Sequence, residues 1–350
     1  HTIRKRERLS LDSITLPEIL KSAGYTSGIF GKWHLGDEKE YRPDNRGFDE
    51  ALSHGAGGLG QVKFGDHKDN KTNPYNDPTL YHNGEFVKKK GYCTDIFFDE
   101  AFSWMQKQKE VDKPFFCYIT PNAPHTPDIC DKKYSDPYEG KVPAPKYYGM
   151  IANIDENIGK FMAKLKSQGF EKDTLVIFMT DNGHSKKRRW DCNAGQKGGK
   201  ITPYQGGIRV PCFFRWPGHF KAGADIDKLT AHIDILPTLA EISGAKIPAA
   251  ANIEGMSLFP LLQSNKSTWP KRTVYTHNGR WKSGQPNKFG GSAIRIGDFK
   301  LVGNKELYNI KKDPQESENI ISSNPEIATK LLQEYGKWWD SIQQDIKIND

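Results

Sequence analysis

Short apolar runs of strand length alternate along the chain with longer segments of helical periodicity. The run TLVIFM (174–179) leads directly into Asp181, Asn182 and Gly183, and we expect the most buried strand of the chain here. Further strands are expected at YTSGIFG (25–31), PFFCYIT (114–120) and VPCFFRWPG (210–218).

Amphipathic helices are predicted between these strands. In TLPEILKSAGY, Thr15 and Glu18 form a capping box, Pro17 sits in the first turn, and Gly24 follows the helix. Apolar residues at spacings of three and four predict a long helix that Gly169 ends, and they are Met150, Ile154, Ile158, Phe161 and Leu165. Two more helices are expected at 94–109 and 232–244.

The alternation of strands and helices predicts the fold class and the domains. Strands that are nearly continuous in apolar residues are typical of a mostly parallel sheet sandwiched by helices, an α/β fold. The pattern changes after about residue 265, where short strands separated by turn residues predict an antiparallel sheet before a final helix at 324–344. We therefore expect an α/β domain at 1–265 and a small α+β C-terminal subdomain at 266–350.

Composition limits the class of protein. The chain has 350 residues, of which 36% are hydrophobic and 27% charged, enough for a large core. Its apolar runs of about six residues fall far short of the roughly 20 that span a membrane. The five cysteines are scattered and have no zinc-like spacing. The net charge of +8 fits either a solvated lysine-rich surface or a polyanionic partner.

Polar residues that could bind a metal or take part in catalysis follow several of the expected strands. In open α/β sheets, ligands bind beyond the carboxyl ends of the strands. Asp181 and Asn182 offer two hard oxygens, which suit Ca²⁺ or Mg²⁺, although the same pair could form a simple turn. Lys32 and His34 are two positions apart and would point to one side if the chain is still extended there.

Two further strand ends carry a histidine and a lysine. His125 lies among three prolines in YITPNAPHTP, and Lys200 lies in the glycine-rich segment GQKGGKITPYQGGIRVP. Each residue alone could be an ordinary surface lysine or a structural histidine. Together with a divalent cation they would form a positive pocket that binds a tetrahedral oxyanion and offsets charge on its oxygens.

Five segments, taken in order, resemble the sulfatase family, the formylglycine-dependent members of the alkaline phosphatase superfamily. They are GYTSGIFGKWHLG, RPDNRGFDE, NAPHTP, VIFMTDNGH and GGKITPYQGGIRVP. The resemblance covers roughly residues 11–265 and implies an alkaline-phosphatase-like fold. The tail ELYNIKKDPQESENI also resembles the family's C-terminal subdomain. Ile201 departs from the pattern, because relatives often have a small residue after the lysine.

The resemblance implies a role for each candidate residue. Asp181 and Asn182 would be two of the calcium ligands, and Lys200 and His125 would hold the sulfate oxygens. Lys32 and His34 would contact the nucleophile, with His34 as a base that helps to expel sulfate. The implied reaction is hydrolysis of sulfate monoesters, with a sulfated small molecule or carbohydrate as the expected partner and no nucleic acid.

The nucleophile of the family is missing from these 350 residues. It is a Cys or Ser in a Cys/Ser-x-Pro-x-Arg motif, oxidised to formylglycine, and none of the five cysteines has this context. We therefore expect an N-terminally truncated sequence that is inactive alone, with the nucleophile and an Asp-Asp metal pair upstream. The family implies a periplasmic or secreted location, although no signal peptide is visible. No oligomeric state is predicted.

Two alternatives stay open at this point. A phosphatase or phosphodiesterase of the same superfamily typically has Asp-His-Gly, with the histidine as a zinc ligand, so Asn182 favours calcium and a sulfatase. A formylglycine-type phosphate or phosphonate hydrolase stays open, because both esters are tetrahedral oxyanions. A non-catalytic module that binds sulfated polymer would also lack the nucleophile. The cationic run Lys186–Arg189 follows the proposed metal ligands. It is either a solvated loop or a contact for further sulfate groups of a polymer.

Overall fold

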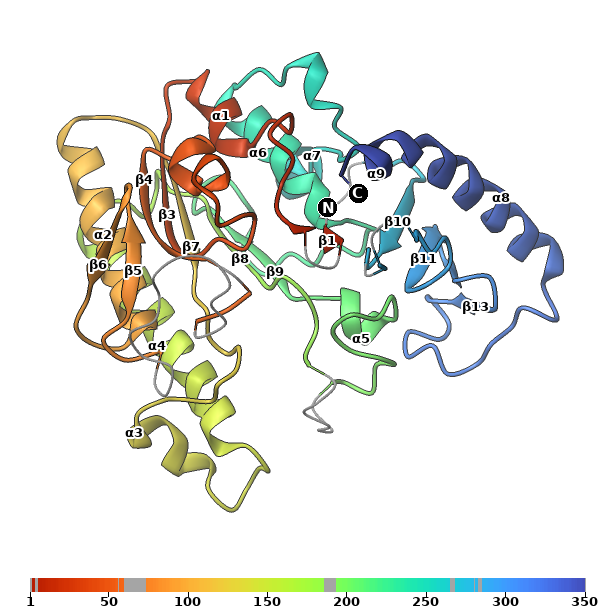
Figure 1. Cartoon of the computed structure of the whole chain (residues 1–350), viewed down its shortest axis with the longest axis horizontal. Coiled ribbons are helices and arrows are strands. Elements are labelled where there is room, and N and C mark those ends of the chain that lie inside the picture. Colours follow the sequence, from red (N-terminus) through yellow and green to blue (C-terminus); the bar gives the residue numbers. More distant parts are fainter. Residues whose placement is uncertain are drawn as a thin grey trace. The chain divides into compact units, whose positions relative to one another are not determined.

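The computed structural model describes residues 2–3, 6–55, 57–59, 74–185, 193–264, 268–279, 281–282 and 285–349 (Figure 1). The chain forms two compact units. We call the one made of Glu7–Lys172 and His232–Phe259 the N-terminal unit. The other, made of His1–Arg6, Asp173–Ala231 and Pro260–Asp350, is the C-terminal unit. The division into an α/β domain at 1–265 and a C-terminal subdomain at 266–350 stays a prediction from the sequence.

A five-stranded sheet forms the centre of the N-terminal unit. Its order is β6 (Glu85–Lys88), β5 (Thr79–His82), β4 (Glu50–His54), β3 (Thr26–Lys32) and β7 (Phe115–Thr120). β3 pairs in parallel with both β4 and β7, whereas β4, β5 and β6 pair antiparallel. The sheet therefore mixes both kinds of pairing.

Helices cover this sheet in two pairs. α1 (Leu16–Lys21) contacts α6 (Ile235–Ser243), and α2 (Cys93–Glu110) contacts α4 (Pro145–Ser167) (Figure 1). Successive residues of β3 point to opposite faces, so Phe30 meets Trp104 of α2 while Ile29 packs with Phe48. Both faces of β3 are covered, so its five central residues, 27–31, are all buried.

The C-terminal unit holds a four-stranded antiparallel sheet in the order β10 (Thr273–His277), β11 (Ser292–Ile296), β12 (Phe299–Val302) and β13 (Glu306–Asn309). One face packs against α8 (Pro325–Ser341) through a core that includes Leu307 and Tyr335. The opposite face buries Tyr308 and packs against Tyr204. Because side chains alternate between the two faces of each strand, one face of the sheet packs against α8 and the other against Tyr204.

The remaining elements are short. β8 (Val176–Met179) and β9 (Cys212–Arg215) form an antiparallel pair, and β1 (Thr2–Ile3) pairs with β2 (Arg6–Glu7). Short α-helices are α3 (Lys132–Ser135), α5 (Gln205–Ile208), α7 (Phe259–Gln263) and α9 (Gln343–Asn349). Single 3-10 turns cover Lys39–Tyr41, Pro43–Asn45, Asp136–Tyr138, His232–Asp234 and Ala249–Ala251.

The predicted α/β class is confirmed, and one expectation about burial is wrong. β8 was expected to be the most buried strand, but Phe178 is 38% exposed and Phe213 of β9 is 64% exposed. The strand hydrogen-bonds to β9 in a two-stranded antiparallel sheet, which leaves its aromatic side chains partly uncovered. An apolar run predicts a strand, but it does not fix how many neighbours that strand has.

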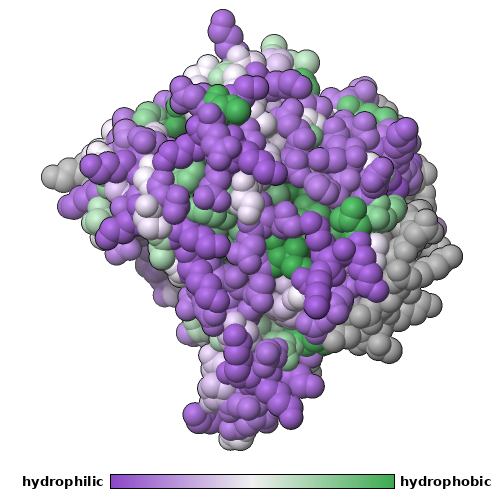
Figure 2. All heavy atoms as spheres, turned by 90° about the vertical axis from the view of Figure 1, so that its left-hand side faces the viewer, coloured by the Kyte–Doolittle hydropathy of each residue, from purple (hydrophilic) through white to green (hydrophobic). Residues whose placement is uncertain are grey.

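The surface is largely polar. Figure 2 shows one face covered mainly by hydrophilic residues, with small hydrophobic areas between them. Within the described part of the chain, no helix combines the length and the apolar character that a membrane crossing needs.

The predicted capping box at Thr15 is present. The Thr15 backbone N–H donates to Glu18 Oε2 at 2.6 Å, and the Thr15 hydroxyl donates to the Arg46 carbonyl at 2.9 Å. Thr15→Ala should therefore lower the free energy of unfolding by about 1–2 kcal/mol in urea denaturation. Ser103→Ala, an exposed position inside α2, is the control and should leave stability nearly unchanged. Equal stabilities of the two variants would contradict the capping role.

Candidate active site

Lys32 and His34 follow the central strand of the N-terminal unit. Lys32 is the last residue of β3, and its carbonyl accepts a hydrogen bond from Thr120 Oγ1 of β7 at 2.8 Å. Gly31 is required here, because a Cβ would lie 2.0 Å from the Thr120 carbonyl oxygen. The chain is not extended at His34, which has a φ of +54°, so the condition for a shared side is not met. The two side chains therefore do not share the side that an extended strand would give them.

His125 follows β7, the parallel neighbour of β3, so it lies at the same sheet edge as Lys32. Its backbone is held on two sides. The His125 N–H donates to the Asn122 carbonyl at 2.9 Å, and the Tyr75 hydroxyl donates to the His125 carbonyl at 2.5 Å. The Asn122 amide donates to the Tyr75 hydroxyl at 2.6 Å, and both side chains are buried.

The His125 ring has a defined orientation. Its Nδ1 lies 2.9 Å from the Thr126 carbonyl oxygen. A carbonyl can only accept, so Nδ1 carries the hydrogen in this contact. Gly58 lies close to this ring, where a Cβ would be 2.8 Å from Nδ1. Sequence reasoning missed Tyr75 and Asn122, although Asn122 stands in the same NAPHTP segment.

Asp181, Asn182 and Lys200 belong to the C-terminal unit, where two backbone hydrogen bonds join their segments. The Gly183 N–H donates to the Gly207 carbonyl at 3.0 Å, and the Lys200 N–H donates to the His184 carbonyl at 2.7 Å. These bonds bring the turn after β8 against the glycine-rich segment that leads into α5. Two motifs that resembled one family are therefore physically paired.

The Asp181–Asn182 turn offers a carboxylate and an amide oxygen, which are suitable ligands for a hard cation. The Asn182 amide nitrogen donates to the Gly183 carbonyl at 2.8 Å, which leaves its oxygen for other contacts, and the neighbouring Asp181 is exposed. Carboxylate and amide oxygens suit Ca²⁺, which takes six to eight oxygen ligands in total. In the described residues, no group of three or more His, Cys, Asp or Glu side chains could hold a metal.

Ile201, next to Lys200, has an unusual backbone. Its φ is +75°, a conformation that β-branched residues rarely adopt, and its side chain is 50% exposed. The Asn278 amide donates to its carbonyl at 3.2 Å. This explains why a small residue would be easier to accommodate after the lysine. The cationic run Lys186–Arg189 lies outside the described residues.

Two protein-family profiles match overlapping parts of the chain. The sulfatase family profile matches residues 4–245, and the profile described as N-sulphoglucosamine sulphohydrolase, C-terminal, matches residues 199–338. The chain therefore belongs to the sulfatase family.

Individual relatives agree with this assignment. The chain is 27% identical to the uncharacterized sulfatase YdeN of Escherichia coli, over 97% of this chain and 68% of that protein. It is 32% identical to mouse N-acetylgalactosamine-6-sulfatase, over 75% of this chain, and it spans about half (51%) of that enzyme's length. The crystal structure of Ps i-CgsB in complex with k-i-k-neocarrahexaose matches with a TM-score of 0.82 and 28% identity, over 95% of this chain and 76% of that one.

The pairing of the two C-terminal segments can be tested at Gly183. A Cβ on this residue would lie 1.9 Å from the Gly206 carbonyl oxygen, and backbone atoms cannot rotate away. Gly183→Ala should therefore separate the turn from the glycine-rich segment. Trypsin should then cleave after Lys200 at least about 10-fold faster, as measured by mass spectrometry of timed digests.

Gly159→Ala provides the matched control. Gly159 lies inside α4, and a Cβ there meets nothing within 4 Å. This substitution should leave cleavage after Lys200 unchanged and slightly stabilise the protein, because alanine favours a helix over glycine. Equal cleavage rates in both variants and the unmodified protein would refute the pairing of the two segments.

Proposed function

We propose that the protein hydrolyses sulfate monoesters of a sulfated carbohydrate. The observation that supports this most directly is the pair of hydrogen bonds, Gly183 N–H to Gly207 and Lys200 N–H to His184, that joins two hard oxygens to a lysine segment. A cation site next to an ammonium group suits an anionic tetrahedral ester. Family membership gives independent support for the sulfate ester as substrate.

Each candidate residue has a role in this proposal. Asp181 and Asn182 hold Ca²⁺, while Lys200 and His125 bind the sulfate oxygens and offset their charge. His125 would use Nε2, because Nδ1 contacts the Thr126 carbonyl. Lys32 and His34 lie beside the attacking group, where His34 accepts a proton.

Two groups that the family implies would complete the chemistry. Ca²⁺, when bound, would draw charge from a sulfate oxygen, and a formylglycine would supply the attacking oxygen. The tasks left to this chain are binding the ester, orienting its oxygens and moving protons.

The carbohydrate is proposed from the relatives. One is named for the 6-sulfate of N-acetylgalactosamine, and the structure with a TM-score of 0.82 holds a neocarrahexaose. We therefore propose a sulfated galactose-type sugar as the substrate class, and an extracellular or periplasmic location where such polymers occur.

The reaction can be tested with the whole gene product, expressed in a host that forms formylglycine. It should release sulfate from N-acetylgalactosamine-6-sulfate or from an aryl sulfate, and it should act at least about 10-fold more slowly on the matching phosphate ester. Ion chromatography measures both products. A preference for the phosphate ester would replace this proposal with the phosphatase alternative, and no turnover of either ester would favour a binding module.

The metal ligands can be tested at Asp181. Asp181→Ala removes one anionic ligand, so calcium content should fall and turnover of the aryl sulfate should drop on the order of 100-fold or more. Asp225→Ala, at an exposed carboxylate of the same unit, is the control and should change neither. If Asp181→Ala keeps both its calcium by elemental analysis and its rate, the turn has no metal role.

A further inference from the structure

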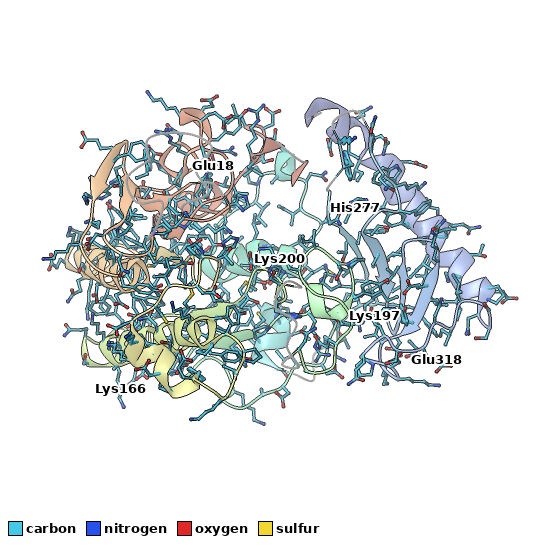
Figure 3. The ribbon with its side chains drawn as sticks, turned by 60° about the horizontal axis from the view of Figure 1, so that its bottom comes forward. Glu18, Lys166, Lys197, Lys200, His277 and Glu318 are labelled. Carbon is cyan, nitrogen blue, oxygen red and sulfur yellow. The ribbon has the colours of Figure 1, made fainter. Side chains whose placement is uncertain are left out.

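The segment that carries Lys200 is closed on itself. We call residues 197–208 the Lys200 loop. The Gly206 N–H donates to the Lys197 carbonyl at 2.8 Å, which joins the two ends of the loop. Inside it, the Thr202 hydroxyl donates to the Gly199 carbonyl at 2.6 Å. Lys200 therefore lies on a compact loop whose position depends on what holds its ends (Figure 3).

One end is held by a fully buried carboxylate. Glu316 is 0% exposed, and its Oε2 accepts the Gln205 backbone N–H at 2.6 Å. Its other oxygen accepts a hydrogen bond from Lys300 Nζ at 2.6 Å, and Lys300 is 1% exposed. Glu316 also has a φ of +58°, which a residue with a side chain rarely adopts.

The second anchor is a cluster around Glu306 of β13. Lys197 Nζ lies 3.0 Å from Glu306 Oε2 and donates to the Tyr308 hydroxyl at 2.7 Å. The Tyr204 hydroxyl donates to Glu306 Oε1 at 2.9 Å, and the Tyr308 hydroxyl donates to Oε2. Burial opposes the charge, but the hydrogen bonds from Tyr308, Lys197 and Tyr204 lower the pKa of Glu306.

Side chains from one face of the antiparallel sheet take part in both anchors, as Lys300 at Glu316 and as Glu306 with Tyr308 at Lys197. Lys300, Glu306 and Tyr308 belong to β12 and β13 and lie opposite the face that packs on α8. Glu306 and Tyr308 contact Lys197 before Lys200, and Glu306 contacts Tyr204 after it. Lys300 reaches Gln205 only through Glu316, which follows β13 in the chain. The antiparallel sheet thus holds the loop directly through Glu306 and Tyr308, and indirectly through the Lys300–Glu316 pair.

Stability alone gives a weak reason for the buried pair. An apolar pair of similar size often stabilises a protein as well as a buried ion pair does. Unlike an apolar side chain, the Glu316 carboxylate accepts a directional hydrogen bond from the Gln205 N–H, and this bond fixes the position of that backbone group. We propose that Glu316 and Glu306 are positioning residues, which set the location of Lys200 relative to the sulfate ester. This inference rests on the proposed function.

Two variants test the inference in the whole protein. Lys197→Met removes one ion of the partly exposed cluster, so the protein should still fold. Lys300→Met with Glu316→Gln removes both buried charges together and leaves neither unpaired. In each variant, hydrogen exchange of peptides from the Lys200 loop should accelerate about 10-fold, while peptides from β11 and α8 keep their protection.

Both variants should also hydrolyse the aryl sulfate less efficiently and bind inorganic sulfate less tightly. Because Lys200 is proposed to bind the sulfate group, kcat/KM for the aryl sulfate should fall about 10-fold in both variants, and inhibition by inorganic sulfate should weaken by a similar factor. Glu334→Gln, which breaks the ion pair with Lys337 on α8, is the control and should change none of these values.

Different results separate this inference from the proposed function. Unchanged exchange in the Lys200 loop, or equal acceleration throughout the C-terminal unit, would overturn the positioning role. Faster exchange of the loop with unchanged kcat/KM and unchanged sulfate inhibition would overturn it as well. If the unmodified protein hydrolyses no sulfate ester, the proposed function fails by itself, and the hydrogen-exchange measurement still decides whether these residues hold the Lys200 loop in place.

Discussion

The structure of the candidate site depends on the close contact between the turn after β8 and the glycine-rich Lys200 loop. Gly183 permits this contact, because any side chain there would collide with the Gly206 carbonyl. The hydrogen bonds from Gly183 to Gly207 and from Lys200 to His184 then fix the two segments together. These bonds join the segment of Asp181 and Asn182 to that of Lys200, although the two lie about twenty residues apart in the sequence. The proposed chemistry requires the two segments to be close.

The small antiparallel sheet has more than a packing role in this account. Its α8 face is an ordinary apolar core, whereas its opposite face carries Lys300, Glu306 and Tyr308 toward the Lys200 loop. The profile match at residues 199–338 begins inside that loop and runs through the sheet. The loop contacts Glu306 and Glu316 in the same stretch, through Lys197, Tyr204 and Gln205.

Much of the fold could be predicted because the signals are local. Capping at Thr15, apolar periodicity in α2 and α4, and the short strand pattern of β3 each depend on neighbouring residues. The β5–β6 hairpin was missed although Asn83-Gly84, both with positive φ, gives a strong two-residue turn signal.

Non-local features could not be predicted in the same way. The left-handed backbone at His34, the exposure of β8 and the burial of Glu316 depend on partners distant in sequence. The most direct test of the central claim is a crystal structure of the whole protein grown with calcium and sulfate. We expect an anomalous calcium peak bound by Asp181 and Asn182, with a sulfate ion contacting both Lys200 and His125. Calcium bound elsewhere, or a sulfate that contacts neither residue, would contradict the account.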